Sequence, residues 1–277
     1  MRIKILGSGQ DAGIPHTGCN CEVCDKARDH NENRRLGPSI AILDDNGDFC
    51  YLIDASPDFK YQLDMIRGEI NEKKRNGRLP ISGILLTHAH LGHFSGLWQL
   101  GREAVNENEL PVFCTLKMKH VLLDNYPFNL LIQNKNIEVV EIHLQKEFKL
   151  NGLTGIPIKV PHRDEVGDTV GYIFQSKKRI IYIPDIDSWT DEVLNEIRNS
   201  DIAIIDGTFY SKGEIPEHDE VPHPSILETI TLLGDIRNEI YFTHINHTNP
   251  INIKGQERKE LERKGYKIAY DGMTIEI

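Results

Sequence analysis

The sequence predicts a large α/β sandwich, and three observations lead to this fold class. Strand-like segments dominate the first half of the chain, and in the second half they alternate with segments of helical periodicity. Many of these strands end in histidine or aspartate, side chains that collect at one edge when strands lie in packed sheets. The length of 277 residues suits a single domain spanning residues 1–277.

The predicted strands are short apolar runs bounded by turn residues. They are Ile3–Leu6, Ser39–Leu43, Phe49–Asp54, Gly83–Thr87, Val112–Cys114, Ile137–His143, Ile156–Val160, Val170–Gln175, Ile180–Pro184, Ile202–Asp206, Glu239–Thr243, Lys267–Tyr270 and Thr274–Ile277. The turn Asp271-Gly272 between the last two predicts a β-hairpin. Helical spacing of apolar residues is clearest in Pro57–Arg67, His93–Val105, Leu116–Asn125, Thr190–Asn199, Ser225–Leu233 and Gln256–Lys264.

Composition indicates a globular protein that acts on small molecules. Hydrophobic residues make up 39% of the chain, enough for a proper core. The chain has 32 Lys and Arg against 42 Asp and Glu, a net charge of −10 that disfavours nucleic-acid partners. No apolar run is long enough for a membrane span and no signal-peptide core follows Met1, so we expect a cytoplasmic protein. The oligomeric state stays open, a homodimer included.

Three histidines follow the strand that ends at Thr87. His88 and His90 are alternate residues leaving the strand, so both imidazoles can point at one ion. Gly92 permits a sharp turn, and His93 then opens a helix. Imidazole suits zinc, iron, manganese and copper, so the ligands alone do not name the metal. Three of twelve histidines within six residues favour a metal site over a histidine-rich polar loop.

The segment from His88 to His93 resembles the His-x-His-x-Asp-His signature of the metallo-β-lactamase superfamily. Later strand ends match the remaining ligands of that family in order: His162, Asp185 and His244. The resemblance implies a four-layer αβ/βα sandwich and a centre for one or two divalent metals, with zinc, manganese and iron as candidates. It assigns His88, His90 and His162 to the first metal, Asp185 to both metals, and His93 and His244 to the second.

Two groups within this superfamily are the most similar. PqqB-like members, which act on a cofactor precursor, resemble Gly7-Ser8-Gly9, Asp54-Ala55-Ser56-Pro57-Asp58 and Pro161-His162-Arg163. PhnP-like members, which are phosphodiesterases, resemble Thr243-His244-Ile245-Asn246-His247 and Tyr270-Asp271-Gly272-Met273.

One position departs from the superfamily pattern. Gly92 stands where the signature has aspartate, which is a ligand of the second metal. We therefore expect a second site with only His93, His244 and Asp185, weak or empty as isolated. On this reasoning Gly92→Asp raises the occupancy of the second site, unless a positive φ at Gly92 resists a side chain.

Cys19, Cys21 and Cys24 lie within six residues, whereas the other two cysteines are isolated in strands. This clustering predicts a structural zinc site in an N-terminal loop at 7–30, with a reactive thiol set as the alternative. The resemblance to PhnP-like members supplies His247 as the fourth ligand. That zinc would brace the loop that carries His244.

Other histidines and acids have assigned roles. By resemblance His223 assists acid–base chemistry, the alternative being an exposed loop histidine. Asp54 and Asp206 end strands, and we expect them to support neighbouring histidines. His16 is either at the mouth of the site or without a role. The remaining histidines, His30, His120, His143 and His218, are expected on the surface.

The leading functional hypothesis is a metallo-hydrolase in which a metal-activated hydroxide attacks a small ester or phosphodiester. His223 and Asp185 are the catalytic candidates, with His223 as proton donor. The alternatives are a PqqB-like enzyme that acts on a cofactor precursor and a degenerate member that binds a ligand without turnover. Gly92 is the main support for the last.

Overall fold

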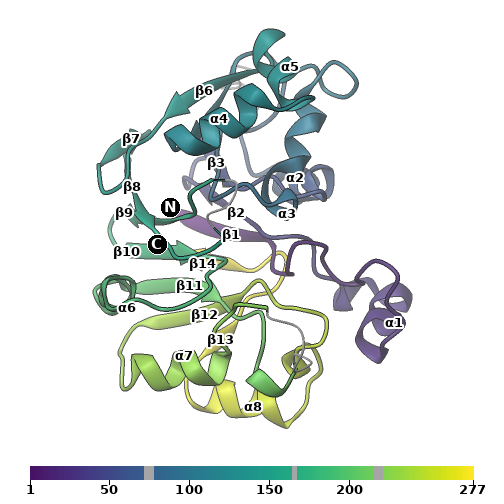
Figure 1. Ribbon diagram of the computed structural model, residues 1–277, viewed down its shortest axis with the longest axis vertical. Coiled ribbons are helices and arrows are strands. Elements are labelled where there is room, and N and C mark those ends of the chain that lie inside the picture. The colour runs from purple at the N-terminus through teal and green to yellow at the C-terminus, as the bar shows by residue number, and fades with distance from the viewer. Residues whose placement is uncertain (72–77, 164–166, 215–220) are drawn as a thin grey trace.

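The computed structural model of the protein describes residues 1–71, 78–163, 167–214 and 221–277, which contain two seven-stranded sheets packed face to face (Figure 1). The first sheet has the order β14-β1-β2-β3-β4-β5-β6. Its strands are β1 (Arg2–Gly7), β2 (Ser39–Leu43), β3 (Cys50–Ile53), β4 (Gly83–Leu85), β5 (Leu110–Cys114), β6 (Ile137–Glu141) and β14 (Thr274–Glu276). The second has the order β13-β12-β11-β10-β9-β8-β7. Its strands are β7 (Phe148–Leu150), β8 (Leu153–Lys159), β9 (Val170–Gln175), β10 (Arg179–Ile183), β11 (Ile202–Asp206), β12 (Glu239–Thr243) and β13 (Lys267–Ile268).

Each sheet is antiparallel in one half and parallel in the other. In the first sheet β3 to β6 run parallel, and in the second β10 to β13 do so. Parallel strands deliver their carboxyl ends to one edge, where ligand sites of α/β proteins form. The segments that follow β3, β4, β10, β11 and β12 carry histidines and aspartates identified in the sequence. The sheet topology therefore brings these side chains to one edge.

Helices cover the outer faces of both sheets and complete four layers (Figure 1). The outer face of the first sheet packs on α2 (Phe59–Ile66), α3 (Leu91–Phe94), η3 (Ser95–Leu100), α4 (Leu116–Asp124) and α5 (Phe128–Gln133). The outer face of the second packs on α6 (Asp191–Arg198), α7 (Ile226–Leu233) and α8 (Gln256–Arg263). The predicted four-layer sandwich is therefore confirmed. None of the helices among the described residues has the length and apolar character that a bilayer crossing requires.

A shared apolar core lies between the sheets. Ile5 and Ile40 of the first sheet meet Tyr172, Tyr182 and Ile204 of the second, all fully buried. Alternation along each strand sends the intervening residues to the outer helices.

Several element predictions were wrong in detail. The last two strands do not form a hairpin: β13 pairs with β12 in the second sheet, and β14 pairs with β1 in the first. The turn at Asp271-Gly272 instead carries the chain from an edge strand of one sheet to an edge strand of the other. The helix predicted at His93–Val105 is a short α3 followed by the 3₁₀ segment η3. Helices α1 (Glu22–Asp29) and α5 were not predicted.

Candidate metal centre

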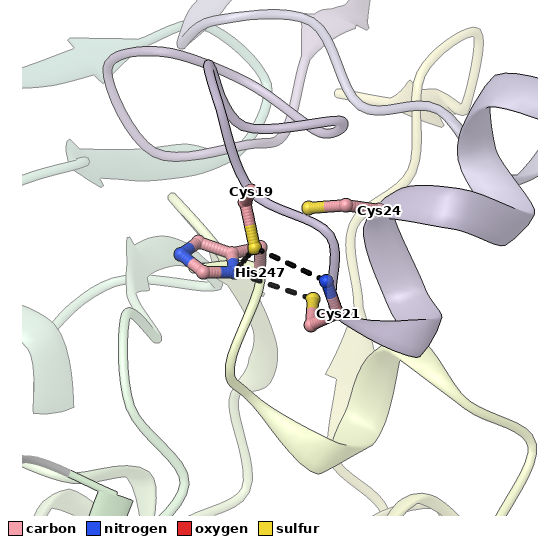
Figure 2. Close-up of side chains that lie close together, drawn as sticks. All are labelled: Cys19, Cys21, Cys24 and His247. Atoms are coloured by element: carbon pink, nitrogen blue, oxygen red, sulfur yellow. Dashed lines mark hydrogen bonds between the residues drawn. The ribbon is translucent and has the colours of Figure 1, made fainter.

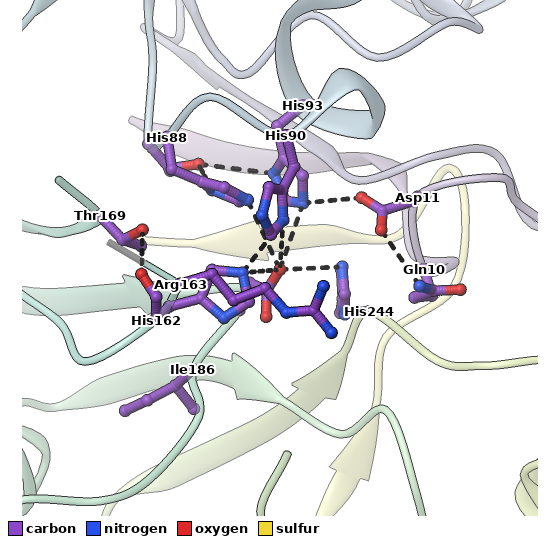
Figure 3. Close-up of polar contacts among 12 residues, drawn as sticks. Gln10, Asp11, His88, His90, His93, His162, Arg163, Thr169, Ile186 and His244 are labelled. Atoms are coloured by element: carbon purple, nitrogen blue, oxygen red, sulfur yellow. Dashed lines mark hydrogen bonds and ion pairs between the residues drawn. The ribbon is translucent and has the colours of Figure 1, made fainter. Parts of the chain in front are cut away.

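The histidine-rich turn lies between β4 and α3, as the sequence predicted. Thr87 and His88 lie two and three residues beyond the end of β4 and are buried, while His90 is the residue before α3 and His93 lies within it. Figure 3 shows these rings converging with His162 and His244 from the second sheet. The centre is therefore assembled from both sheets.

Two of the rings supplied by the first sheet, those of His88 and His93, are each held through Nδ1. His88 Nδ1 lies 2.9 Å from Thr87 Oγ1, which itself donates to Asp54. His93 Nδ1 donates to Asp54 Oδ2 at 2.7 Å. Asp54 thus supports two rings, as expected from its place at the end of β3, and its φ of 66° turns it out of the strand.

The two rings supplied by the second sheet, those of His162 and His244, also have a partner at Nδ1. His162 Nδ1 donates to Asp187 Oδ1 at 2.6 Å, and His244 Nδ1 lies 2.8 Å from Thr208 Oγ1. His244 has a φ of 60°, a left-handed conformation that is uncommon for a histidine and concentrates at functional sites. Sequence reasoning missed Asp187 and Thr208, although Asp187 lies only two residues after Asp185.

The Asp185 carboxylate lies at the meeting point of these rings. Its Oδ2 is 3.1 Å from His162 Nε2 and 3.5 Å from His88 Nε2. The same atom is 3.8 Å from both His93 Nε2 and His244 Nε2. Ligand atoms that lie about 2.1 Å from one ion are roughly 3.0–3.4 Å apart at octahedral or tetrahedral angles. Small adjustments would therefore bring two groups of ligands around two ions that share Asp185.

Five of the inward-facing atoms are buried and make no hydrogen bonds within the described part of the chain. They are His88 Nε2, His93 Nε2, His244 Nε2, Asp185 Oδ1 and Asp11 Oδ1. A buried polar atom without a partner is costly, and several of them facing one point indicate a missing cation. The donor set of imidazoles and carboxylates suits zinc, manganese and iron, so the residues fit the metal that the sequence predicted.

The protonation states are compatible with metal binding at most of these rings. Burial lowers the pKa of His88, of His90 and of His244, which leaves the three rings neutral at pH 7. For His93, burial alone would lower the pKa, but Asp54 outweighs it and raises the pKa to about 9. An ion must displace that proton in order to bind His93.

His223 borders the centre instead of being exposed. Its side chain is only 7% exposed, and its Nδ1 donates to Asp206 Oδ2 at 2.8 Å and lies 3.5 Å from Asp185 Oδ1. Burial would lower its pKa, but the Asp206 carboxylate raises it to about 9. Asp206 therefore has the supporting role that the sequence predicted, and the alternative of an exposed loop histidine is excluded.

A residue that sequence reasoning missed lies opposite His93. Asp11 Oδ1 is 3.4 Å from His93 Nε2, and Asp11, His93 and His244 form a further group of potential metal ligands. We expected Gly92 to leave Asp185 as the one carboxylate beside His93 and His244. That expectation was wrong, because the Asp11 carboxylate also lies beside His93. No local motif marks Asp11, which precedes Gly92 by 81 positions; the only signal was its place in the loop after the first strand.

The second cluster is the predicted cysteine group (Figure 2). The Sγ atoms of Cys19 and Cys21 lie 3.5 and 3.6 Å from His247 Nδ1, and Cys24 completes the group. In a tetrahedral zinc site, sulfur and nitrogen ligands are about 3.6 Å apart. Burial and the neighbouring thiols raise the pKa of Cys24 to about 12, so the thiolate form of Cys24 needs a cation beside it. The geometry matches a structural zinc site.

The remaining histidines within the described residues lie outside the centre. The His16 ring packs against His247 with the centroids 4.8 Å apart, so His16 borders the cysteine cluster and not the mouth of the centre. The side chains of His30, His120 and His143 are 61–62% exposed, as expected. His218 lies outside the described residues.

Comparisons with known proteins agree with this geometry. Residues 50–245 match the protein family described as "Beta-lactamase superfamily domain". "Coenzyme PQQ synthesis protein B" of Rhizobium meliloti (strain 1021) is 30% identical over 309 residues, which cover 100% of this chain and 98% of that protein.

Two solved structures resemble the whole chain. Zinc-bound PqqB from Methylobacterium extorquens has a TM-score of 0.86 at 27% identity, with 100% of both chains covered. "A New Diphosphatase from the PhnP Family" has a TM-score of 0.73 at 26% identity, covering 100% of this chain and 98% of that one. The zinc-bound structure and the ligand clusters support divalent-metal binding. Fold, ligand order and family match agree, and the chain belongs to the β-lactamase superfamily.

Proposed function

We propose that this chain is a metal-dependent hydrolase of small phosphodiesters or related esters. The observation that carries the proposal is the arrangement around Asp185: its carboxylate faces two groups of histidines, and His223 lies beside it with a proton-bearing ring nitrogen. A divalent ion held by these residues lowers the pKa of a coordinated water and polarises the scissile group. The cysteine cluster holds a structural Zn²⁺, and the centre takes zinc, manganese or iron.

The roles of the chain's own residues follow from their contacts. Asp206 holds His223 by its Nδ1, which fixes the ring and leaves Nε2 to donate a proton to the leaving group. Arg163 follows His162 and is exposed, and its side chain extends across the face of the centre in Figure 3. A guanidinium there favours an anionic substrate such as a phosphodiester over a neutral ester.

A leaving-group series tests the proposal. The zinc- or manganese-loaded protein is assayed with aryl and alkyl phosphodiesters and with matched carboxylic esters. We expect His223→Gln to lower kcat by about 10²–10⁴-fold for alkyl leaving groups, and by less for nitrophenyl groups that depart without a proton. The exposed His143→Gln is the control and keeps full activity. An equal loss across the series would contradict the role of His223, and no turnover by the metal-loaded chain would contradict hydrolysis.

The second candidate is a PqqB-like role on a cofactor precursor. It is favoured by the identity of 27–30% with PQQ synthesis proteins over the whole chain. Conversion of such a precursor, without hydrolysis of any ester in the series, would decide for it. The alternative of a degenerate member that binds a ligand without turnover rested on the carboxylate missing at Gly92. The Asp11 carboxylate beside His93 weakens that argument.

A further inference from the structure

Gly92 occupies a position where backbone conformation does not require glycine. It lies inside α3, and its φ is not in the positive, left-handed range that favours glycine. Space is the constraint instead. A Cβ at Gly92 would lie 2.1 Å from Asp11 Oδ1, 2.5 Å from Asp11 Cβ and 2.6 Å from Asp11 Cα. Any side chain at position 92 would therefore overlap Asp11, its backbone included.

The backbone holds Asp11 firmly in this position. The chain leaving β1 pairs with the chain leaving β12: Ile245 N donates to Ser8 O at 2.9 Å, and Gln10 N donates to Ile245 O at 3.1 Å. Because Ile245 directly follows His244, this pairing places Asp11 beside a predicted ligand. On its other side the turn closes through Gly13 N, which donates to Gln10 O at 2.6 Å.

The two oxygens of Asp11 differ in their surroundings. Oδ2 accepts a hydrogen bond from Gln10 Nε2 at 3.1 Å. Oδ1 is buried, makes no hydrogen bond among the described residues, and points at His93 Nε2 3.4 Å away (Figure 3). That Nε2 and His244 Nε2 are also buried without hydrogen bonds. A cation between these three atoms would satisfy all of them.

We propose that Asp11 is a ligand of the second metal and takes the place of the aspartate that the superfamily signature carries at position 92. The second site then has His93, His244, Asp11 and the shared Asp185, two imidazoles and two carboxylates. The carboxylate reaches the same point in space from the N-terminal loop, and Gly92 is the residue that makes room for it. The inference concerns the same centre as the proposed function, but it does not require that the centre hydrolyse any substrate.

This assignment removes the gain in occupancy that was expected from restoring the signature by Gly92→Asp. Gly92→Asp would bring a further carboxylate to the ion, but its Cβ cannot coexist with Asp11 at 2.1–2.6 Å. The loop must then move away, and Asp11 leaves with it. Gly92→Ala overlaps Asp11 in the same way and adds no ligand, so we expect it to weaken binding of the second metal.

Metal binding tests the assignment without an activity assay. The protein, with zinc in its cysteine cluster, is titrated with Mn²⁺, and bound ions are counted while electron paramagnetic resonance distinguishes a coupled Mn²⁺ pair from single ions. We expect a coupled pair in the natural protein. Asp11→Asn, which preserves the size of the side chain, and Gly92→Ala should bind the second ion at least about 10-fold more weakly and show single-ion spectra.

Controls separate loss of a ligand from damage to the fold. Gln10→Ala removes the partner of the non-ligating oxygen and should keep the coupled pair. Retention of the cysteine-bound zinc shows that each variant is folded around its N-terminal loop. A coupled pair of unchanged affinity in Asp11→Asn, or a single ion in the natural protein at saturating Mn²⁺, would overturn the assignment. A coupled pair that hydrolyses no ester would refute the proposed function and leave the assignment of Asp11 intact.

Discussion

Removing the structural zinc by Cys21→Ser should release about one zinc per chain and unfold the segment around α1, leaving the sandwich folded. Cys21 is the residue before α1, and its Sγ lies 3.6 Å from His247 Nδ1. Serine is a poor zinc ligand, because zinc in structural sites prefers thiolate and imidazole. In Figure 1 α1 projects from the side of the two sheets, away from the helices that cover them.

The expected loss of local stability is large because few other contacts stabilise α1. The helix has eight residues, and only Cys24 and Ala27 are buried. Isolated helices shorter than about 12–15 residues are marginal in water. Ordering eight residues costs about 8–16 kcal/mol of backbone entropy, and zinc binding to a site of this kind contributes about 10–16 kcal/mol. The two magnitudes are comparable, so without the ion the ordering cost is no longer offset and the folded form of the segment is not stable.

Hydrogen exchange and metal analysis check this together. Amides of α1 should exchange as in an unfolded chain, whereas those of β10, in the middle of the second sheet, stay protected. Cys114→Ser, at a buried cysteine outside the cluster, is the matched control and should retain its zinc. If Cys21→Ser keeps one zinc in the cluster and α1 stays protected, the reasoning about this site is refuted.

Two further predictions concern the N-terminal loop and the substrate. Arg35 is 8% exposed and donates to Ser8 Oγ, Ala269 O and Asn252 Oδ1. Because Arg35→Met leaves these buried acceptors unpaired, it should lower the free energy of unfolding, measured by urea titration, by about 2–5 kcal/mol. An unchanged midpoint would show that water replaces those hydrogen bonds. The net charge of −10 predicts that the metal-loaded protein does not process precursor transfer RNA at rates comparable with small esters, which a gel-based cleavage assay measures.

Much of the centre could be predicted because its ligands follow strand ends. His88, His162, Asp185 and His244 each come directly or nearly directly after an apolar strand, and parallel strands bring such positions to one edge. The three cysteines could be read in the same way, because they are close in sequence. In both cases the signal is local, because each residue is marked by its immediate neighbours in the sequence.

The residues beyond those patterns depended on distant parts of the chain. Asp187 and Thr208 orient the rings of His162 and His244, and they could be identified as partners only from the final distances. The last two strands formed a plausible hairpin by local rules, yet each joined a different sheet. A turn sequence reports the local bend, whereas strand pairing depends on which sheet edge is open.

The sequence by itself determined the α/β class, the histidine and aspartate ligands at strand ends, and the cysteine cluster, because each depends on the spacing of neighbouring residues. Only the tertiary structure decided which carboxylate lies beside His93 and His244. The pairing of Ser8 and Gln10 with Ile245 brings Asp11 to the space beside Gly92. A metal ion responds to the positions of oxygen and nitrogen atoms, and residues 81 positions apart can exchange that role only when the fold places them in contact.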